Sequence, residues 1–492
     1  MCHPWGGTLL RKHPLLWSVL LAVLPLLGWW TYGLFDLDEG FYGAVAVEMN
    51  RRGEWITPFY NGQPWFEKPI LLYWLAKPSI ALFGIWFGPR LPSILATIAT
   101  YCLTGWFTKR HYGPAAAVFS VLALGSSLLI VGVGRMMLTD PLLNLCMAAA
   151  FFTFWESLDG DPRWRLATAA ALGFGVLAKG PIAGILFIPP TIYLFARFPE
   201  RRPQFKGMWV PGVLIFLAIV ASWYLPAYLV DGHMFIQKFL VEQNLNRFTG
   251  GDEAHNVPLS ARFVFYIPIF LVGFAPWSVV LFRTWKTPVG DPTLNRYLWV
   301  CLLTVFIFFT ITSAKLVHYI APMGPPLAVL VGAWLAEKAP LTAQRLAPTV
   351  AWLLAVAVIA EGGFYGWDLA VHHREIQDLA LYVRDHASPS DQVVEYEMGK
   401  QPGKPSVGPV KINETSQPST VMILDRTVTN LESWPDILKL EKPAWILTRN
   451  NRISPEELKE AGPSLRQIET PLRQDLYRLY YWSPSRKMGG TG

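Results

Sequence analysis

The chain has 492 residues, of which 52% are apolar and only 16% are charged, and its mean hydropathy is +0.30. Soluble domains carry about a quarter charged residues, so this composition excludes an ordinary soluble protein and indicates a polytopic helical membrane protein. The formal net charge is +7. The basic residues are scattered between apolar segments, which argues against nucleic-acid binding and fits positively charged inner loops.

Apolar runs near the length of a bilayer crossing recur along the first 366 residues. We predict transmembrane segments near residues 15–34, 91–108, 114–133, 141–157, 164–178, 181–197, 209–230, 259–283, 297–313, 316–336 and 347–366. With the N-terminus inside, the lysines and arginines between these segments fall mainly in inner loops, as the positive-inside rule expects. The first segment lacks a small-residue cleavage site, so we interpret it as a retained signal anchor.

Two further helical stretches are predicted to lie along the outer membrane surface. If residues 68–84, KPILLYWLAKPSIALFG, crossed the membrane, every later basic loop would face outward. The Lys77-Pro78 step in the middle of this run also favours an interfacial helix. Residues 41–53 read as a second short surface helix that ends at Gly53.

The composition becomes polar after Tyr365. Strand-like runs at 391–397, 419–425, 443–449 and 475–482 alternate with helical stretches such as 374–386. We therefore predict an all-α membrane domain over residues 1–366, with about 11–13 transmembrane helices, followed by a small α/β domain outside the membrane over residues 367–492.

This topology places several charged segments on the outer face. They are the acidic loop 36–40, the FEKP motif 66–69, Asp140, Lys179, the polar loop 231–257 and the run Lys315–His318. Charges inside or beside transmembrane helices are costly, so each is a candidate functional residue. Asp38 and Asp140 together could form an acid/base or metal-binding pair. The alternatives are a solvated helix end for Asp38 and a helix cap before Pro141 for Asp140.

Cationic side chains gather on the same predicted face. Lys179, Arg247 and Lys315 suit the phosphate of a lipid carrier, although a lysine at a helix end can also extend to the interface without a ligand. Glu67 and Lys68 could be a local ion pair of little energetic value. His255 and His318 could bind a metal together with Glu67, but lone histidines are more often structural. The sequence contains no Walker phosphate loop, HExxH motif or GxSxG elbow.

These residues lie in segments that resemble a known family. DEGFYGAVAVEMNRRGEWITPFYNGQPWFEKPILLYWL, MLTDPLLN, LAKGPIAG, HNVP, FAPWS and SAKLVHYIAPMGPPLA closely resemble the bacterial aminoarabinose lipid A transferases and their relatives. These enzymes belong to the protein O-mannosyltransferase-like group with the GT-C fold. The resemblance covers roughly residues 30–335, and the combination of FEKP with AKGP is specific to the group.

The resemblance implies an inverting glycosyltransferase of the bacterial inner membrane. It would take a sugar from a polyprenyl (undecaprenyl) phosphate carrier and pass it to a lipid A-like or other glycan acceptor on the outer side. Residues at motif positions receive the family's roles: Asp38 and Asp140 as catalytic carboxylates, and Glu39, Tyr42, Glu67, Lys68, Lys179, Arg247, Lys315 and His318 as substrate contacts. Glu67 and His255 would hold a divalent metal, and no nucleotide cofactor is implied.

One position departs from the pattern. Close relatives often have Arg two residues after the Asp-Glu pair, where this chain has Phe41, which puts the identity of the sugar and acceptor in doubt. Two alternatives remain open at this stage. A protein O-mannosyltransferase-like enzyme would use a Ser or Thr hydroxyl as acceptor. A transporter or flippase would need polar residues near mid-membrane and commonly repeated halves, and the charged residues here cluster at span ends.

Overall fold

The computed structural model describes residues 13–36, 38–159, 161, 163–197, 209–246, 259–338, 341–371, 373–398 and 417–484. The chain forms two compact units. The first comprises residues 1–29, 66–75 and 90–363, and the second comprises residues 30–65, 76–89 and 364–492. The second unit thus combines the first predicted outer loop with the C-terminal region.

The first unit is a helical bundle. Its elements are α2 (Pro14–Val23), η1 (Leu24–Leu26), the start of α4 (Leu71–Phe87), α5 (Leu91–Gly125), α6 (Leu128–Gly134), α7 (Asp140–Asp159), α8 (Trp164–Lys179), α9 (Ile182–Arg197), α10 (Trp209–Phe235), the π-helix η3 (Ile236–Asn246), α12 (Leu259–Gly273), α13 (Trp277–Lys286), α14 (Pro292–Ile311), η4 (Val317–Met323), α15 (Gly324–Lys338) and most of α16 (Ala343–Val371). Proline in the first turn of α2, α5 and α14 suits a position whose N–H has no helical partner.

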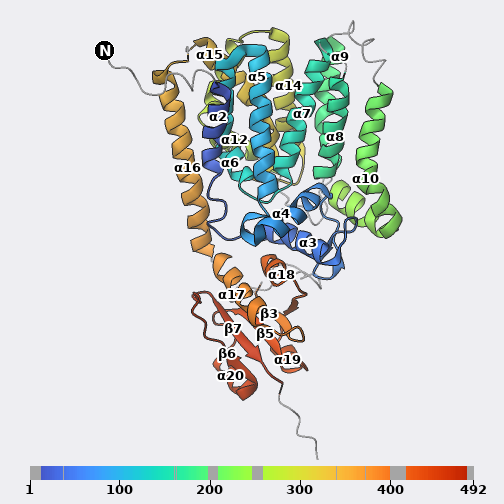
Figure 1. The fold of residues 1–492 in the computed structure, drawn as a ribbon, viewed down its shortest axis with the longest axis vertical. Coiled ribbons are helices and arrows are strands. Elements are labelled where there is room, and N and C mark those ends of the chain that lie inside the picture. The colour runs from blue at the N-terminus through green and yellow to red at the C-terminus, as the bar shows by residue number, and fades with distance from the viewer. Residues whose placement is uncertain are drawn as a thin grey trace, which may run out of the picture. The chain divides into compact units, whose positions relative to one another are not determined.

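Helix α5 organises this bundle, because it packs against α2, α7 and α15 (Figure 1). Small residues permit the close approach. A Cβ on Gly332 of α15 would lie 2.6 Å from the Ala116 carbonyl oxygen of α5, and one on Gly125 would lie 2.4 Å from the Ala22 side chain of α2. Helices in membranes associate largely through such close packing, since lipid offers no hydrophobic drive between them.

Five of the described helices are long and apolar enough to cross a membrane, and two bent pairs raise the number to seven. By length and composition, the described part of the chain therefore has fewer candidate membrane helices than the 11–13 that we predict. The predicted span 114–133 is wrong as one helix, because α5 ends at Gly125 and α6 begins at Leu128. The predicted span 259–283 is likewise two helices, α12 and α13, bent by 103°.

The predicted surface helices are present as helices. Helix α4 bends by 103° from α5, so it does not extend the axis of that membrane helix. It continues through Pro78, and the Lys77 ammonium donates to the carbonyl oxygens of Met49 and Glu54. Helix α3 (Glu39–Arg52) ends at Gly53, whose φ of 70° is the left-handed conformation that glycine adopts without strain.

The second unit contains a five-stranded sheet of order β4-β3-β5-β7-β6. Its strands are β3 (Gln392–Tyr396), β4 (Thr429–Leu431), β5 (Ala444–Arg449), β6 (Leu465–Gln467) and β7 (Tyr477–Trp482). The first three of these are parallel to one another, whereas β7 runs antiparallel to both β5 and β6. A separate short hairpin joins β1 (Phe59–Tyr60) and β2 (Gln63–Pro64).

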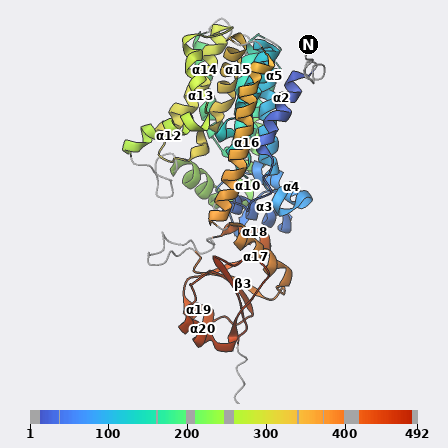
Figure 2. The same cartoon turned by 90° about the vertical axis from the view of Figure 1, so that its left-hand side faces the viewer.

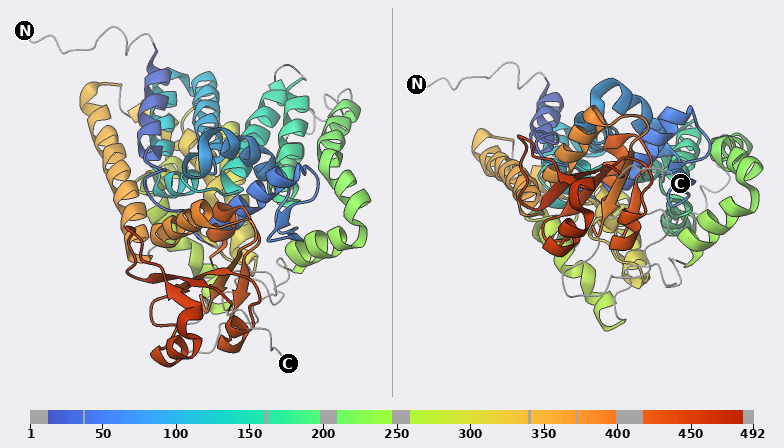
Figure 3. Two further views of the ribbon diagram at one scale, coloured as in Figure 1. Left: turned by 60° about the horizontal axis from the view of Figure 1, so that its bottom comes forward. Right: turned by 90° about the horizontal axis from the view of Figure 1, so that it is seen from below.

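Helices cover both faces of this sheet. Helices α19 (Trp434–Leu438) and α20 (Pro455–Ala461) share a core with Val394 and Ile446. Helices α17 (His373–His386) and α18 (Pro418–Leu424) contact the opposite face, where Tyr382 packs on Trp445 and Thr420 donates to Glu395. Figures 2 and 3 show this layering.

The predicted strands at 391–397, 443–449 and 475–482 and the helix at 374–386 are confirmed. The predicted strand at 419–425 is wrong. Residues 418–424 form helix α18, which starts at Pro418 and is buried along its whole length. A short apolar run without polar alternation does not distinguish a buried strand from a buried helix.

Candidate active site

Asp140 stands at the first residue of α7 and is only 2% exposed. The N-terminal end of a helix stabilises a carboxylate through its unpaired N–H groups and its dipole. Burial of an ion is expensive unless opposite charges and hydrogen bonds accompany it. The neighbours of Asp140 therefore decide what this carboxylate can do.

Three basic side chains of the first unit lie near or act on the Asp140 carboxylate. The Lys179 ammonium at the end of α8 donates to Oδ1 at 2.5 Å, and His318 Nε2 lies 3.6 Å from Oδ2. Lys68, in the FEKP motif, acts on the same carboxylate through its charge. The structure thus brings together four of the predicted site residues, which come from four separate sequence motifs.

Tyr319 completes this cluster and was not singled out from the sequence. The Lys179 ammonium lies 4.4 Å from the centre of the Tyr319 ring, and the His318 and Tyr319 rings meet edge to face at 5.2 Å. A cation above an aromatic face is stabilised by the ring quadrupole. The only hint in the sequence was its position next to His318.

Lys315 is buried but makes different contacts. Its ammonium donates to the carbonyl oxygens of Phe309 and Thr310 in the last turn of α14, where helical carbonyls have no partner of their own. Burial, together with the nearby charge of Arg262, lowers the pKa of Lys315 to about 8. Two of its three donors are therefore engaged with backbone, and a role at a carrier phosphate stays a prediction.

Asp38, Glu39 and Tyr42 belong to the second unit, at the start of α3. Glu39 is fully buried, and its Oε2 accepts the N–H of Phe35 at 2.8 Å, so this carboxylate holds the loop together. Asp38 is half-buried. The one polar contact of its side chain in the described residues is a long one, 3.4 Å from the Tyr42 hydroxyl to Oδ1.

Phe41 packs within an aromatic cluster of the second unit. Its ring stacks on Trp65 with centroids 5.1 Å apart, and Tyr60 lies 4.7 Å away. The side chain one helical turn after Asp38 is thus uncharged and apolar.

Two predicted site residues, Arg247 and His255, lie outside the described residues. Glu67 is half-buried, and its charge acts on the buried Tyr73 hydroxyl. Within the described part of the chain, no three His, Cys, Asp or Glu side chains lie close enough to hold a metal ion. The proposed metal ligands Glu67 and His255 therefore remain a prediction.

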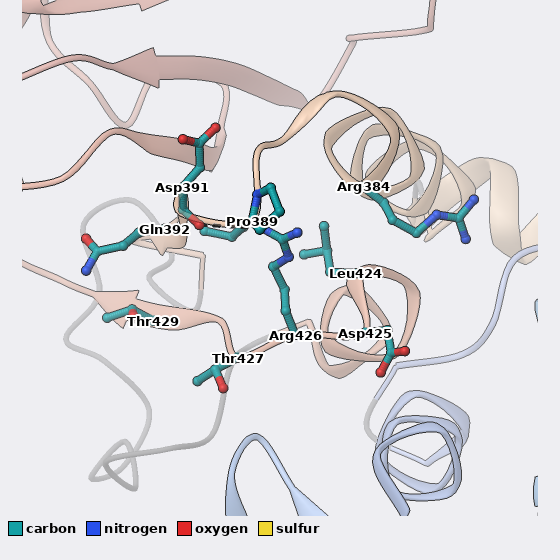
Figure 4. Close-up of a pocket in the computed structure, with 10 residues that line it drawn as sticks. Arg384, Pro389, Asp391, Gln392, Leu424, Asp425, Arg426, Thr427 and Thr429 are labelled. Carbon is teal, nitrogen blue, oxygen red and sulfur yellow. Dashed lines mark hydrogen bonds between the residues drawn. The ribbon is translucent and has the colours of Figure 1, made fainter. Parts of the chain in front are cut away.

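An open pocket of about 640 Å³ lies in the second unit, and none of the predicted site residues lines it. Figure 4 shows Arg426 reaching from the end of α18 toward Pro389. The Arg426 guanidinium donates to the carbonyl oxygens of Ser388 and Asp391, and the Asp391 carboxylate accepts from the Trp445 indole at 3.1 Å. These contacts serve mainly to hold the start of β3 and the loop after α18.

Known proteins resemble this chain in sequence and in fold. The family model described as dolichyl-phosphate-mannose-protein mannosyltransferase matches residues 67–225. An undecaprenyl phosphate-alpha-4-amino-4-deoxy-L-arabinose arabinosyl transferase of Pectobacterium carotovorum is 30% identical over 364 residues, 70% of this chain and 63% of that protein. A protein of Aquifex aeolicus called uncharacterized is 33% identical over 332 residues, 67% of this chain and 74% of its own length. The chain thus spans less than two thirds of the arabinosyl transferase.

Solved structures share the fold over nearly the whole chain. ArnT from Cupriavidus metallidurans bound to undecaprenyl phosphate matches with a TM-score of 0.70 at 20% identity, covering 94% of this chain and 98% of that one. The oligosaccharyltransferase of Archaeoglobus fulgidus matches with a TM-score of 0.51 at 11% identity, covering 91% and 70%. The chain has the fold of these structures, the GT-C fold, and its sequence is similar to those of the bacterial aminoarabinose transferases.

Proposed function

We propose that the protein is a glycosyltransferase that takes a sugar from a polyprenyl (undecaprenyl) phosphate carrier. The observation that carries this proposal is the buried cluster of Asp140, Lys179 and His318, with Lys68 close enough to act on the same carboxylate. One buried acid meets two lysines and an imidazole, and a phosphate group would supply the further negative charge. The names of the arabinosyl transferase relatives support this choice of donor.

The transfer needs a leaving group whose charge is neutralised and an acceptor hydroxyl that loses its proton. Lys68, Lys179 and His318 would stabilise the departing carrier phosphate through preorganised charges. Asp140 would hold Lys179 and His318 in place, because its two oxygens each face one of them. Asp38 would act as the base, since its carboxylate is half-buried and makes only the long contact to Tyr42 among the described residues.

The bond between sugar and carrier phosphate supplies the free energy, so no nucleotide is needed. Glu67 is the one proposed metal ligand that the structure describes, and a divalent metal there would stabilise negative charge on the donor phosphate. If Glu67 and His255 hold a divalent cation, removal of the metal with a chelator would abolish sugar transfer, and adding the metal again would restore the activity.

We infer that the acceptor is a lipid A-like lipid or another glycan on the outer face of the bacterial inner membrane. The apolar helices make the chain a multi-pass membrane protein. The distribution of lysines and arginines along the sequence supports an outward-facing site and an extracytoplasmic C-terminal domain. The description of the matched family model favours a second acceptor class, the Ser or Thr hydroxyl of a protein.

Sugar transfer by the purified protein in liposomes tests the proposal. Radiolabelled polyprenyl-phosphate sugars, both neutral and amino-substituted, would be offered with lipid A, with other glycolipids or with a Ser/Thr peptide, and the released carrier phosphate would be measured. We expect the wild type to release carrier only when an acceptor is present. Transfer to the peptide alone would identify a protein glycosyltransferase instead.

The Asp38→Asn variant would be compared with the wild type in this assay, since the substitution removes the base while keeping the size of the side chain. Asp385→Asn is the matched control, because Asp385 is an exposed acid of the same unit whose one partner among the described residues is its neighbour Arg384. Equal activity in all three proteins would remove Asp38 from catalysis. The absence of transfer and carrier release by the wild type over the whole panel would refute the proposed function.

A further inference from the structure

The loop before Asp38 is held by the C-terminal domain within the second unit. Gln377 of α17 is fully buried, and its side-chain amide pairs with both polar groups of one loop residue. Oε1 accepts the N–H of Leu34 at 2.9 Å, while Nε2 donates to the Leu34 carbonyl oxygen at 2.7 Å. This paired geometry fixes the position and the orientation of the loop backbone at residue 34.

A second anchor lies two residues before Asp38. Asp36 Oδ1 accepts the backbone N–H of Ser419 at 2.7 Å, and Oδ2 accepts its hydroxyl at 2.9 Å. Ser419 lies in the first turn of α18, whose own N-cap residue Gln417 makes no side-chain capping bond. Asp36 thus serves as the cap of that helix from 383 positions away in the chain, where a carboxylate is also favoured by the helix dipole.

The two anchors form one network. Gln377 Nε2 also lies 3.1 Å from the Ser419 hydroxyl oxygen, which in turn donates to Asp36. Ser419 and Gln377 are both completely buried. Buried polar groups need all their partners, because an unpaired one has lost its hydration without compensation. The network therefore has one well-defined arrangement and places residues 34 and 36 in it.

Helices α3 and α18 pack closely along the same segment. A Cβ on Gly40 would lie 2.7 Å from the Ser419 nitrogen, and one on Gly43 would lie 2.3 Å from the Met422 sulfur. At the far end, the Arg51 guanidinium pairs with the Asp425 carboxylate at 3.1 Å. The start, middle and end of α18 thus contact successive positions along α3. Asp38 is the N-cap residue of α3, and in the sequence it lies between the two anchors and the packed glycines.

We propose that Gln377 and Ser419 are positioning residues for Asp38, so that the C-terminal domain sets the placement of the reacting carboxylate. This inference rests on the proposed role of Asp38 in sugar transfer. Asp36 belongs to the same hydrogen-bond network, and its carboxylate connects the loop to α18. The acidic residues of the loop thus have different roles. Asp36 and Glu39 form hydrogen bonds within the protein, whereas Asp38 acts as the base.

Three variants of the full chain in liposomes test the network. Gln377→Leu keeps the volume of the side chain and removes both bonds to Leu34, Ser419→Ala removes the hydroxyl, and Asp36→Asn keeps an acceptor for the Ser419 N–H. Ser454→Ala is the matched control. It replaces another serine of the same domain, which caps α20 through a capping box with Glu457.

We expect Gln377→Leu and Ser419→Ala to lower kcat for sugar transfer by about 10- to 100-fold, because small misplacements of a reacting group are costly. KM for the carrier-linked sugar should stay within about twofold, since the phosphate site lies on other residues. Asp36→Asn should retain most of the activity. Ser454→Ala should keep the wild-type kcat although it weakens the same domain.

Amide hydrogen exchange supplies a readout that does not depend on activity. The amides of residues 34–40 should exchange faster in Gln377→Leu and Ser419→Ala than in the wild type and in Ser454→Ala. Unchanged exchange, or faster exchange with wild-type kcat, would overturn the inference. If the wild type transfers no sugar at all, the proposed function fails, and exchange alone then decides whether the network holds the loop.

Discussion

The two carboxylates that the sequence singled out have opposite surroundings in their respective units. Asp140 is buried in the first unit, with a lysine and a histidine on its two oxygens. Asp38 in the second unit is half-buried and makes a single long contact in the described structure, to Tyr42. A carboxylate that is fully paired with cations is poorly suited to accept a proton, whereas one with little pairing can do so.

This difference assigns separate tasks to two acids that look alike in the sequence. Asp140 would organise the positive charges that receive a phosphate, and Asp38 would take the proton from the acceptor. The assignment predicts that loss of Asp38 harms the chemical step with little effect on folding. Loss of Asp140 should harm folding and donor binding together.

The largest expected effect is therefore the loss of catalysis caused by Asp38→Asn. General-base catalysis contributes about 10²- to 10⁴-fold, so kcat should fall by at least about 100-fold while KM for the donor and the thermal unfolding midpoint stay close to wild type. Steady-state kinetics in liposomes and a melting curve in detergent measure both quantities. A large drop in the unfolding midpoint would mean that Asp38 is structural, and the contrast with Asp140 would disappear.

The next effect concerns Asp140→Asn, which leaves the Lys179 ammonium without its anionic partner. Breaking a buried ion pair costs about 3–5 kcal/mol in the free energy of unfolding, and donor binding should weaken as the cations lose their arrangement. The double variant Asp140→Asn with Lys179→Met should recover part of the stability, because the unpaired charge is gone. Additive losses in this cycle would show that the two side chains act independently.

The extent to which the site could be predicted also differs between the two units. Asp140, Lys179, Lys68 and His318 were all named from short motifs, and the structure joins them because each motif lies at a helix end or in the turn beside one. Tyr319 was missed because aromatic residues are abundant in membrane helices and carry no signal alone. Short motifs were sufficient to predict these residues, because each residue lies at or beside a helix terminus that its own motif forms.

The anchors of the Asp38 loop could not have been predicted in this way. Gln377 and Leu34 are 343 positions apart, and neither residue belongs to a recognisable motif. Residues 419–425 were expected to form a strand, which hid the helix end that Asp36 caps. Propensity and periodicity describe local structure, so a tertiary contact that turns an apolar run into a buried helix lies beyond them.

A smaller effect is expected at the close packing of α3 on α18. Gly43→Ala would place a Cβ against the Met422 sulfur and force the helices to shift, at a cost of about 1–3 kcal/mol in the free energy of unfolding. Met422→Ala in the same chain should relieve the clash and recover part of the loss. Gly132→Ala is the control, since no atom lies within 4 Å of its Cβ position. Equal losses for Gly43→Ala and Gly132→Ala would contradict the packing.

The smallest effect is a pH dependence that originates in the first unit. The pKa of Lys315 falls from 10.5 to about 8 on folding, so between these values the unfolded chain binds more protons than the folded chain at this site. Lys315 therefore lowers the stability most below about pH 8, and this penalty disappears as the pH rises to 10.5. Unfolding in detergent at pH 7–10.5 should show a stability that rises with pH, and Lys315→Met should reduce this slope. An unchanged slope would mean that another group titrates, and that the backbone carbonyls of Phe309 and Thr310 keep Lys315 charged throughout this range.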